Sequence, residues 1–253
     1  MGTFPNITAH EGCEGTVPGS LSSVEEGLRC GADFIEVDVR RTREGALVIS
    51  HDKLSEEEYR SCVRLAQVLE LVKQAGTAGV NCDIKEEDIL HDVLDLFERL
   101  GFSYEQIVLS GSITPAMLKK DPSIVRRANV LLNIEEVLKE LCVERLRAEG
   151  NGEDSSKLPP WEVVHRYIPD LSAYFDDLTD ICLSTNVRAI NLPYRAPISA
   201  FLPRFRALHL PVSAWTIDDL GDIHTLLREG IYNITTRKVR LALEARKNCA
   251  LNK

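Results

Sequence analysis

The sequence predicts an α/β protein with a single-domain (β/α)8 TIM barrel, and three observations support this fold class. The chain has 253 residues, which is the size at which single α/β barrels occur. Short runs rich in β-branched residues alternate with longer runs of helical periodicity, which is typical of parallel strands joined by crossover helices. We count about eight such strand-like runs, which favours a closed barrel over an open doubly wound sheet.

The first half of the predicted barrel begins with the short strand "ITAH". The helix-like run "SLSSVEEGLRCG" follows, which Ser20 or Ser22 could cap and Gly31 could end. Two strands come next, "FIEVDV" and "ALVIS", joined by a turn around "REG". The run "RLAQVLELVKQAG" has apolar residues at helical spacing, "GVNCDIK" is typical of a strand, and "DILHDVLDLFERLG" predicts a helix ended by glycine.

The second half contains the remaining strands and one long crossover. The strand-like runs are "QIVLSG", "VLLNIE", "AINLPY", "PVSAWTI" and "YNITT", with helical runs such as "DDLGDIHTLLREG" between the last of them. The polar segment "AEGNGEDSSKLPP" predicts a surface loop, and the amphipathic run that follows it predicts helix. We therefore predict one barrel over residues 1–253, with a helical and loop insertion at 136–188.

Charge and composition exclude several classes of partner. The chain carries 30 basic and 39 acidic residues, a net charge of −9, and it has no basic tract interleaved with aromatic residues. Nucleic acid is therefore not an expected partner. No apolar run approaches the ~18 residues needed to span a bilayer, so stable membrane insertion is not expected either. Nothing in the sequence specifies an oligomeric state.

The seven cysteines are scattered and odd in number, and no pair has the CxxC spacing. This pattern argues against a disulfide scaffold and against a cysteine zinc site. The N-terminal segment lacks the charged and apolar regions of a signal peptide. We therefore expect a reducing compartment, the cytoplasm.

Acidic residues interrupt the apolar strand "FIEVDV". Glu36 and Asp38 are two residues apart, so their side chains lie on one face of the strand. Asp83 and Lys85 end a later strand, and His10 and His51 end or follow two others. A barrel places its active site at the C-terminal ends of its strands, so these groups should converge there.

Three carboxylates that meet would repel one another unless a cation balances them. Oxygen ligands of this kind suit Mg²⁺ or Ca²⁺, with Mn²⁺ as a further candidate. Two histidines beside such an ion can act as general acid and general base, because imidazole titrates near neutrality. Lys85 could hold an anionic oxygen as a point charge.

Each of these residues also has a purely structural interpretation. A histidine at a strand end can be structural, and Glu36 and Asp38 could pair with Arg40 or Arg41. Asp83 and Lys85 could simply pair with each other. The position of all of them at strand ends of one alternating pattern favours the metal site.

These motifs resemble those of the glycerophosphodiester phosphodiesterase family. "AHEG" is similar to the family's opening "HRG", and "FIEVDVRRTREGALVISHD" to its Glu-x-Asp block followed by His-Asp. "VNCDIK" is similar to the family's "E-x-K", and "PVSAWTIDDLGDIHTLLREGIYNITTRK" to its C-terminal block ending in "TDRP". The resemblance spans nearly the whole chain and implies a TIM barrel with metal-dependent phosphodiesterase activity on a small diester.

The resemblance also implies individual roles. His10 and His51 would be the acid–base pair, and Glu36, Asp38 and Asp83 would bind the cation. The remaining implied residues contact or line the substrate site, and they are Lys85, Trp215 and Glu11. Trp215 could equally be a core aromatic residue.

Among the departures from the family pattern, three bear directly on the proposed site. Glu11 stands where the family has a phosphate-binding Arg, and Asp83 replaces Glu, as in the related sphingomyelinase D branch. The segment after "HDKL" that shapes the glycerol pocket is largely missing. Three hypotheses result: a diester hydrolase releasing a phosphomonoester such as glycerol 3-phosphate, a repurposed non-catalytic barrel, and a cyclising phospholipase D-like lyase.

Overall fold

The computed structural model describes residues 5–149, 157–168, 171–193 and 198–251. Within these described ranges, nine strands form one sheet, in the order β1-β9-β8-β7-β6-β5-β4-β2-β3, and β1 also pairs with β2. All pairings are parallel except the one between β2 and β3, so eight parallel strands close into a barrel to which β3 is added. This confirms the predicted (β/α)8 fold and excludes the open sheet.

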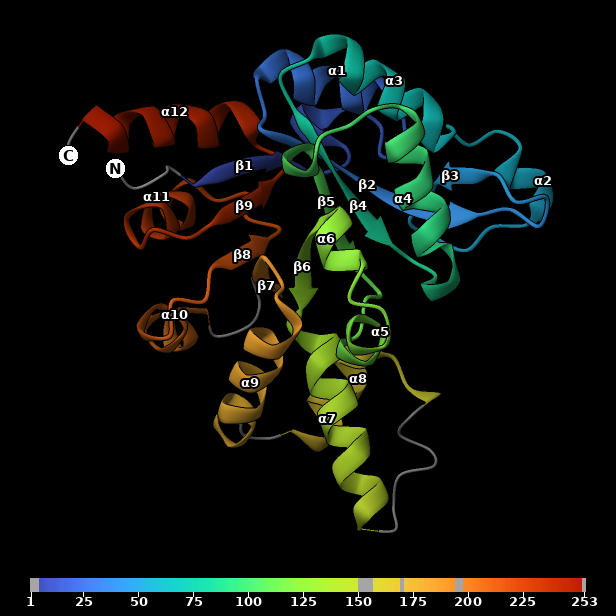
Figure 1. Cartoon of the computed structure of the whole chain (residues 1–253). Coiled ribbons are helices and arrows are strands. Elements are labelled where there is room, and N and C mark those ends of the chain that lie inside the picture. Colours follow the sequence, from blue (N-terminus) through green and yellow to red (C-terminus); the bar gives the residue numbers. More distant parts are fainter. Residues whose placement is uncertain (1–4, 150–156, 169–170, 194–197, 252–253) are drawn as a thin grey trace.

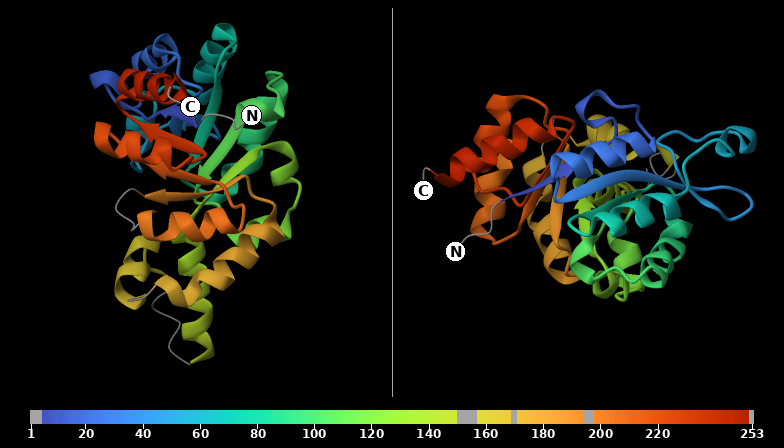
Figure 2. Two further views of the ribbon diagram at one scale, coloured as in Figure 1. Left: turned by 90° about the vertical axis from the view of Figure 1, so that its left-hand side faces the viewer. Right: turned by 90° about the horizontal axis from the view of Figure 1, so that it is seen from above.

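The strands lie close to the runs that the sequence predicts. Their bounds are β1 Asn6–Ala9, β2 Phe34–Arg41, β3 Leu47–Ile49, β4 Gly79–Ile84, β5 Ile107–Gly111, β6 Asn129–Asn133, β7 Ala189–Pro193, β8 Val212–Trp215 and β9 Asn233–Thr236. The strands occupy the middle of the molecule and the helices surround them (Figures 1 and 2). Apolar side chains between the strands and this outer layer form the main core, as in other α/β barrels.

The first helix begins and ends at the signals seen in the sequence. Ser20 caps the first helix by accepting a hydrogen bond from the Ser23 amide, and Gly31 ends it at φ 88°. The helices are α1 Leu21–Cys30, α2 Glu56–Tyr59, α3 Leu65–Ala75, α4 Leu90–Arg99, α5 Pro115–Lys120, α6 Ile124–Arg127, α7 Ile134–Ala148, α8 Pro160–Tyr167, α9 Phe175–Thr185, α10 Ile198–Ala207, α11 Leu220–Arg228 and α12 Val239–Leu251. In the part of the chain that the structure describes, no helix is long and apolar enough to cross a membrane.

Two parts of the molecule extend beyond the plain barrel. The hairpin of β2 and β3, followed by α2, projects from one side (Figures 1 and 2). Helices α7, α8 and α9 all lie between β6 and β7, and they gather at one end of the molecule (Figure 1). We retain the proposal that 136–188 is an insertion. Most of its predicted polar loop, 150–156, lies outside the described residues.

Gly111 at the end of β5 allows β4 and β5 to approach closely beside Asp83. Its φ is +88°, and a Cβ added there would collide with Asp83 Oδ1 and with the backbone of Ile84. We expect Gly111→Ala to lower the free energy of unfolding by about 3 kcal/mol, measured by urea denaturation.

The matched control is Gly45→Ala. Gly45 has φ +86°, but a Cβ there would meet nothing within 4 Å. Gly45→Ala should therefore lower the free energy of unfolding only through the unfavourable backbone conformation, by about 1–2 kcal/mol. Equal losses for the two variants would show that the close approach at Gly111 contributes nothing.

Candidate active site

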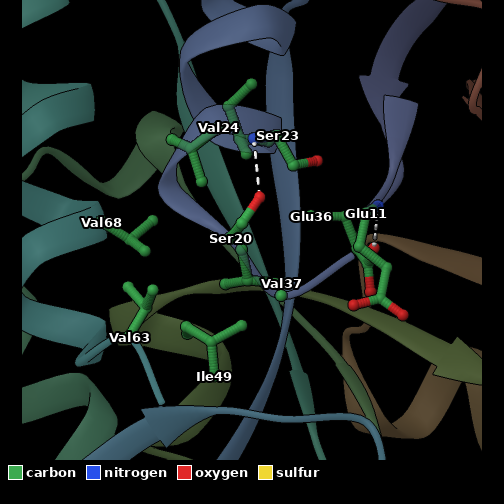
Figure 3. Close-up of a pocket in the computed structure, with 11 residues that line it drawn as sticks. Glu11, Ser20, Ser23, Val24, Glu36, Val37, Ile49, Val63 and Val68 are labelled. Atoms are coloured by element: carbon green, nitrogen blue, oxygen red, sulfur yellow. Dashed lines mark hydrogen bonds between the residues drawn. The ribbon is translucent and has the colours of Figure 1, made fainter. Parts of the chain in front are cut away.

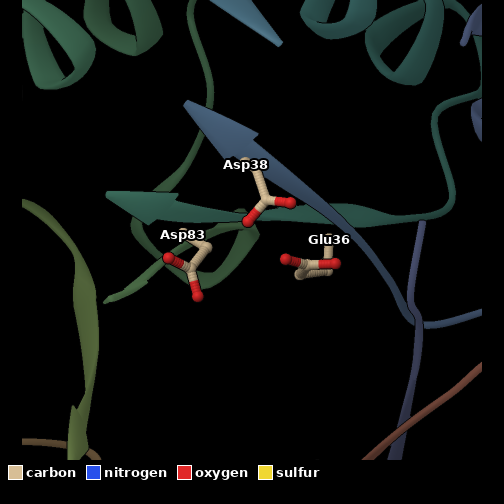
Figure 4. Close-up of side chains that lie close together, drawn as sticks. All are labelled: Glu36, Asp38 and Asp83. Atoms are coloured by element: carbon tan, nitrogen blue, oxygen red, sulfur yellow. The ribbon is translucent and has the colours of Figure 1, made fainter. Parts of the chain in front are cut away.

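Three carboxylates meet at the C-terminal end of the barrel. Glu36 and Asp38 lie on the same face of β2, and Asp38 is directly opposite Asp83 in the parallel pairing of β2 with β4. One oxygen from each carboxylate lies within 4.8 Å of the others, and the three groups surround a common space (Figure 4). Glu36 and Asp38 are only 5% and 2% exposed, so water screens their charges poorly.

Lys85 is the cation in contact with this cluster. Its Nζ lies 2.6 Å from Asp38 Oδ1 and 3.1 Å from Asp83 Oδ1. Asp83 and Lys85 do form an ion pair, as the purely structural interpretation expects, but Lys85 also forms an ion pair with Asp38. The other oxygen, Asp38 Oδ2, is buried without a hydrogen-bond partner among the described residues. A buried carboxylate oxygen without a partner is costly and points to a missing positive ligand.

Burial and the repulsion from neighbouring carboxylates both act to raise the pKa of Glu36 and of Asp83. The pKa of Glu36 is raised well above its usual range by burial and by the neighbouring Asp38 and Asp83. Burial also raises the pKa of Asp83, although Lys85 counteracts the rise. Burial would lower the pKa of Lys85, but Asp83 and Asp38 outweigh it and raise that pKa. A hard divalent cation held by Glu36, Asp38 and Asp83 fits this donor set.

The arginines of β2 do not neutralise the cluster. Arg40 lies 3.3 Å from Glu86, and Arg41 pairs with Asp88 and Asp92. The interpretation of Glu36 and Asp38 as partners of Arg40 or Arg41 is therefore not what the structure shows.

His10 follows β1 and faces the carboxylates. Its Nδ1 lies 3.1 Å from the carbonyl oxygen of Glu11, which can only accept, so Nδ1 donates the hydrogen bond. The other ring nitrogen, Nε2, is 3.9 Å from Glu36 Oε2. Burial lowers the pKa of His10, and Arg237 adds to this effect, against the opposing hydrogen bond to Glu11. This arrangement favours a neutral imidazole with a basic Nε2 beside the acids.

His51 follows β3 and approaches the site from the projecting hairpin. Its side chain is 66% exposed, and Nδ1 lies 2.9 Å from Asp52 Oδ1. It is near enough to the site for its charge to oppose the rise in the pKa of both Glu11 and Asp83. Both predicted histidines therefore lie at the rim that holds the acids.

Arg40 attaches the His51 loop to the barrel. Its Nε and Nη2 donate to the His51 carbonyl oxygen at 3.2 and 2.9 Å, while its Nη1 pairs with Glu86. We expect Arg40→Gln to speed amide exchange at residues 50–53 roughly tenfold, because charge-assisted hydrogen bonds contribute about 1.5 kcal/mol or more. Hydrogen exchange followed by mass spectrometry measures this.

Arg43→Gln is the control for Arg40. Arg43 lies in the same hairpin, is 87% exposed and pairs with Glu56. Its loss should leave exchange at 50–53 unchanged. Equal protection in Arg40→Gln and wild type would remove Arg40 as the anchor of this loop.

Glu11 turns toward the carboxylates. Its backbone amide donates to Glu36 Oε2 at 3.4 Å, and the two side chains lie next to each other in Figure 3. Burial and the nearby Asp38 raise the pKa of Glu11 to about 7, against the opposing charge of His51. The position that the resemblance assigns to a phosphate-binding cation thus carries a fourth acid.

Trp215 ends β8 and is partly exposed. Its indole Nε1 is buried with no hydrogen-bond partner among the described residues. Buried indole N–H groups usually have a partner, so this unpaired donor is unusual. We retain it as a proposed substrate-lining residue.

A small cavity lies beside Glu11 and Glu36, lined by residues of α1, β2, β3 and α3. Glu11, Glu36, Ser20 and Val24 are among its lining residues (Figure 3). Its volume is about 10 Å³, which suffices for one water molecule at most. The cavity is therefore too small to hold a substrate.

Sequence reasoning missed two pairs of residues at this rim. The first is Arg40 with Glu86, and the second is Asp218 with Arg237, whose Nη1 lies 3.2 Å from Asp218 Oδ2. Strand alternation could have found Arg40, which is two residues after Asp38. The pairing of Asp218 with Arg237 joins separate strand ends and has no local signal.

Comparisons with known proteins agree with this geometry. Residues 10–119 match the model of the glycerophosphoryl diester phosphodiesterase family. The chain is 25% identical over 243 residues to probable glycerophosphodiester phosphodiesterase 2 of Mycobacterium tuberculosis, covering 88% of this chain and 82% of that protein. A local match to the uncharacterized Bacillus subtilis protein YqiK is 42% identical over 48 residues, which is 19% of this chain and 20% of that protein.

Solved structures show the same fold. An Oleispira antarctica phosphodiesterase, determined in complex with the product sn-glycerol-3-phosphate, superposes with a TM-score of 0.68 at 15% identity. The match covers 96% of this chain and 97% of that one. The segment that contains the three carboxylates and both histidines, residues 10–119, is thus similar to the glycerophosphoryl diester phosphodiesterase family, and the whole chain shares the fold of solved phosphodiesterase structures.

Proposed function

We propose that the protein is a metal-dependent phosphodiesterase that hydrolyses small glycerophosphodiester-like substrates to a phosphomonoester and an alcohol. The observation that carries this proposal is the meeting of Glu36, Asp38 and Asp83 within 4.8 Å, with His10 Nε2 3.9 Å from Glu36. Glu36, Asp38 and Asp83 would hold the cation, Mg²⁺ or Ca²⁺ with Mn²⁺ as a further candidate. When bound, such an ion polarises a phosphoryl oxygen.

The two histidines would move the protons of the reaction. One imidazole accepts a proton from the attacking water as the new P–O bond forms. The other donates a proton to the departing alkoxide as the second P–O bond breaks. His10 has a basic Nε2 beside the acids, and His51 is exposed at the opening, so both are accessible to a bound diester.

The test is release of glycerol 3-phosphate from a panel of glycerophosphodiesters. The purified protein is assayed with Mg²⁺, Mn²⁺ or Ca²⁺, and again after chelation with EDTA. We expect turnover with at least one ion and none after chelation. Binding of an ion without turnover on any diester would favour a repurposed barrel instead.

The other two hypotheses are weaker. Glu11 motivates a non-catalytic barrel, but both histidines and all three carboxylates are retained at one rim. A cyclising lyase would use a substrate hydroxyl in place of water, and phosphorus NMR distinguishes it. A cyclic phosphate as the first product would establish the lyase, whereas a ring-opened product from the start supports hydrolysis.

We also propose the cytoplasm as the location. The seven cysteines are all free thiols, which fits a reducing compartment.

A further inference from the structure

The mouth of the barrel holds an excess of acid around the proposed phosphate site. Glu11, Glu36, Asp38 and Asp83 all lie there, and Lys85 is already shared by Asp38 and Asp83. Arg40 is bound to Glu86 and to the His51 carbonyl. A phosphodiester carries a negative charge. A positively charged side chain other than Lys85, free to rotate toward the phosphate, is therefore required at this rim.

Arg237 occupies the right place by strand register. Ala9 of β1 lies opposite Thr236 of β9, and the His10 amide donates to the Thr236 carbonyl at 3.0 Å. Arg237 therefore stands beside His10, at the position where β9 ends.

The alternation along β9 predicts an inward side chain at Arg237, the residue that follows the strand. Asn233, two positions before Thr235, contacts inward side chains of both neighbouring strands, Thr8 at 2.7 Å and Ser213 at 2.9 Å. Asn233 also donates to Thr235 at 3.2 Å, so both residues share this face. Alternation extends the same face to Arg237. The effect of its charge on the pKa of His10 agrees with this placement.

Asp218 holds Arg237 at the rim without burying it. Asp218 Oδ1 accepts from the Arg237 amide at 2.8 Å, and Oδ2 lies 3.2 Å from Nη1. The guanidinium is 50% exposed. Ion pairs this exposed contribute little, so the pair can open or share the guanidinium with a ligand at small cost.

We propose that Arg237 binds a phosphate oxygen of the substrate and so replaces the cation that Glu11 excludes from the position after His10. The inference rests on the proposed function, since it assigns a residue to the same site. A guanidinium can donate two parallel hydrogen bonds to phosphate, which a lysine cannot reproduce. The phosphate would thus be held from the β9 side of the barrel.

Calorimetric titration with inorganic phosphate at saturating Mg²⁺ tests this without turnover. We expect Arg237→Gln to weaken phosphate binding roughly 10- to 100-fold, the size of a lost charge-assisted contact, and Arg237→Lys to restore part of it. Asp218→Asn should bind phosphate at least as tightly as wild type. The control is Arg240→Gln: Arg240 is 54% exposed, and it pairs with Glu14 and Glu26, so phosphate binding should not change.

The outcomes separate this inference from the proposed activity. Phosphate binding that depends on Arg237, with no turnover on any diester, would refute the hydrolase and retain the phosphate site. Turnover by wild type, with equal phosphate affinity in wild type, Arg237→Gln and Arg237→Lys, would refute the role of Arg237 alone. Failure of wild type to bind phosphate at all would also overturn it. Thermal melts establish that each variant is folded.

Discussion

Asp38→Asn is expected to abolish both cation binding and metal-dependent turnover. Asp38 is 2% exposed, faces Asp83 across the β2–β4 pairing and has one buried oxygen without a partner among the described residues. The amide removes one negative charge and presents an N–H₂ group that repels a cation. A ligand at 100 times its dissociation constant stabilises a protein by about 2.7 kcal/mol, and the variant should lose that gain.

Thermal melts with and without Mg²⁺ or Ca²⁺ measure the effect of Asp38→Asn. The control is Asp88→Asn: Asp88 is 67% exposed and pairs with Arg41 outside the cluster. Wild type and Asp88→Asn should melt higher with the ion present, whereas Asp38→Asn should not. An unchanged metal-induced shift in Asp38→Asn would remove the carboxylate cluster as the cation site.

His10→Ala and His51→Ala should each lower kcat by about 10²–10⁴-fold, the usual contribution of a positioned proton donor or acceptor. Metal affinity should stay near that of wild type, because neither imidazole is among the proposed ligands. Since the two groups act in one step, the double variant should lose little more than the worse single variant.

Steady-state kinetics and metal titration on the same preparations provide the test. The control is His91→Ala: His91 lies on α4, is 56% exposed and pairs with Asp121. It should turn over substrate at the wild-type rate. Near-normal kcat in either His10→Ala or His51→Ala would exclude that histidine from the chemistry.

The barrel could be predicted because local patterns specify it. Alternation within "FIEVDV" sets Glu36 and Asp38 on one face, and the same period sets Asp83 and Lys85. Because the strands run parallel, their C-terminal ends lie at the same end of the barrel, and the side chains at those ends meet at one rim. The position of the three carboxylates and the two histidines at one rim can therefore be predicted from local periodicity and from the rule that parallel barrel strands are connected by crossovers.

Other features depend on contacts that no local pattern contains. The turning of Glu11 toward the acids depends on the backbone that follows β1 and on the Glu36 carboxylate 25 positions away. The anchoring of the His51 loop depends on Arg40, which reaches across the hairpin to the His51 carbonyl and also pairs with Glu86, a residue that follows β4. The short helices α5 and α6 have too few turns to show a period. Tertiary contacts therefore determine the orientation of Glu11, the anchoring of the His51 loop and the formation of α5 and α6.

The closure of the barrel through β1 has a consequence for synthesis of the chain on the ribosome. β1 pairs with β2 on one side and with β9, Asn233–Thr236, on the other. His10 emerges early, but its amide finds its carbonyl partner only when Thr236 has been made. A nascent chain that ends after β5 therefore already holds the three clustered carboxylates, yet has two unpaired sheet edges that can associate with other chains. Chaperone protection during that interval should matter more for this protein than for one built from local contacts.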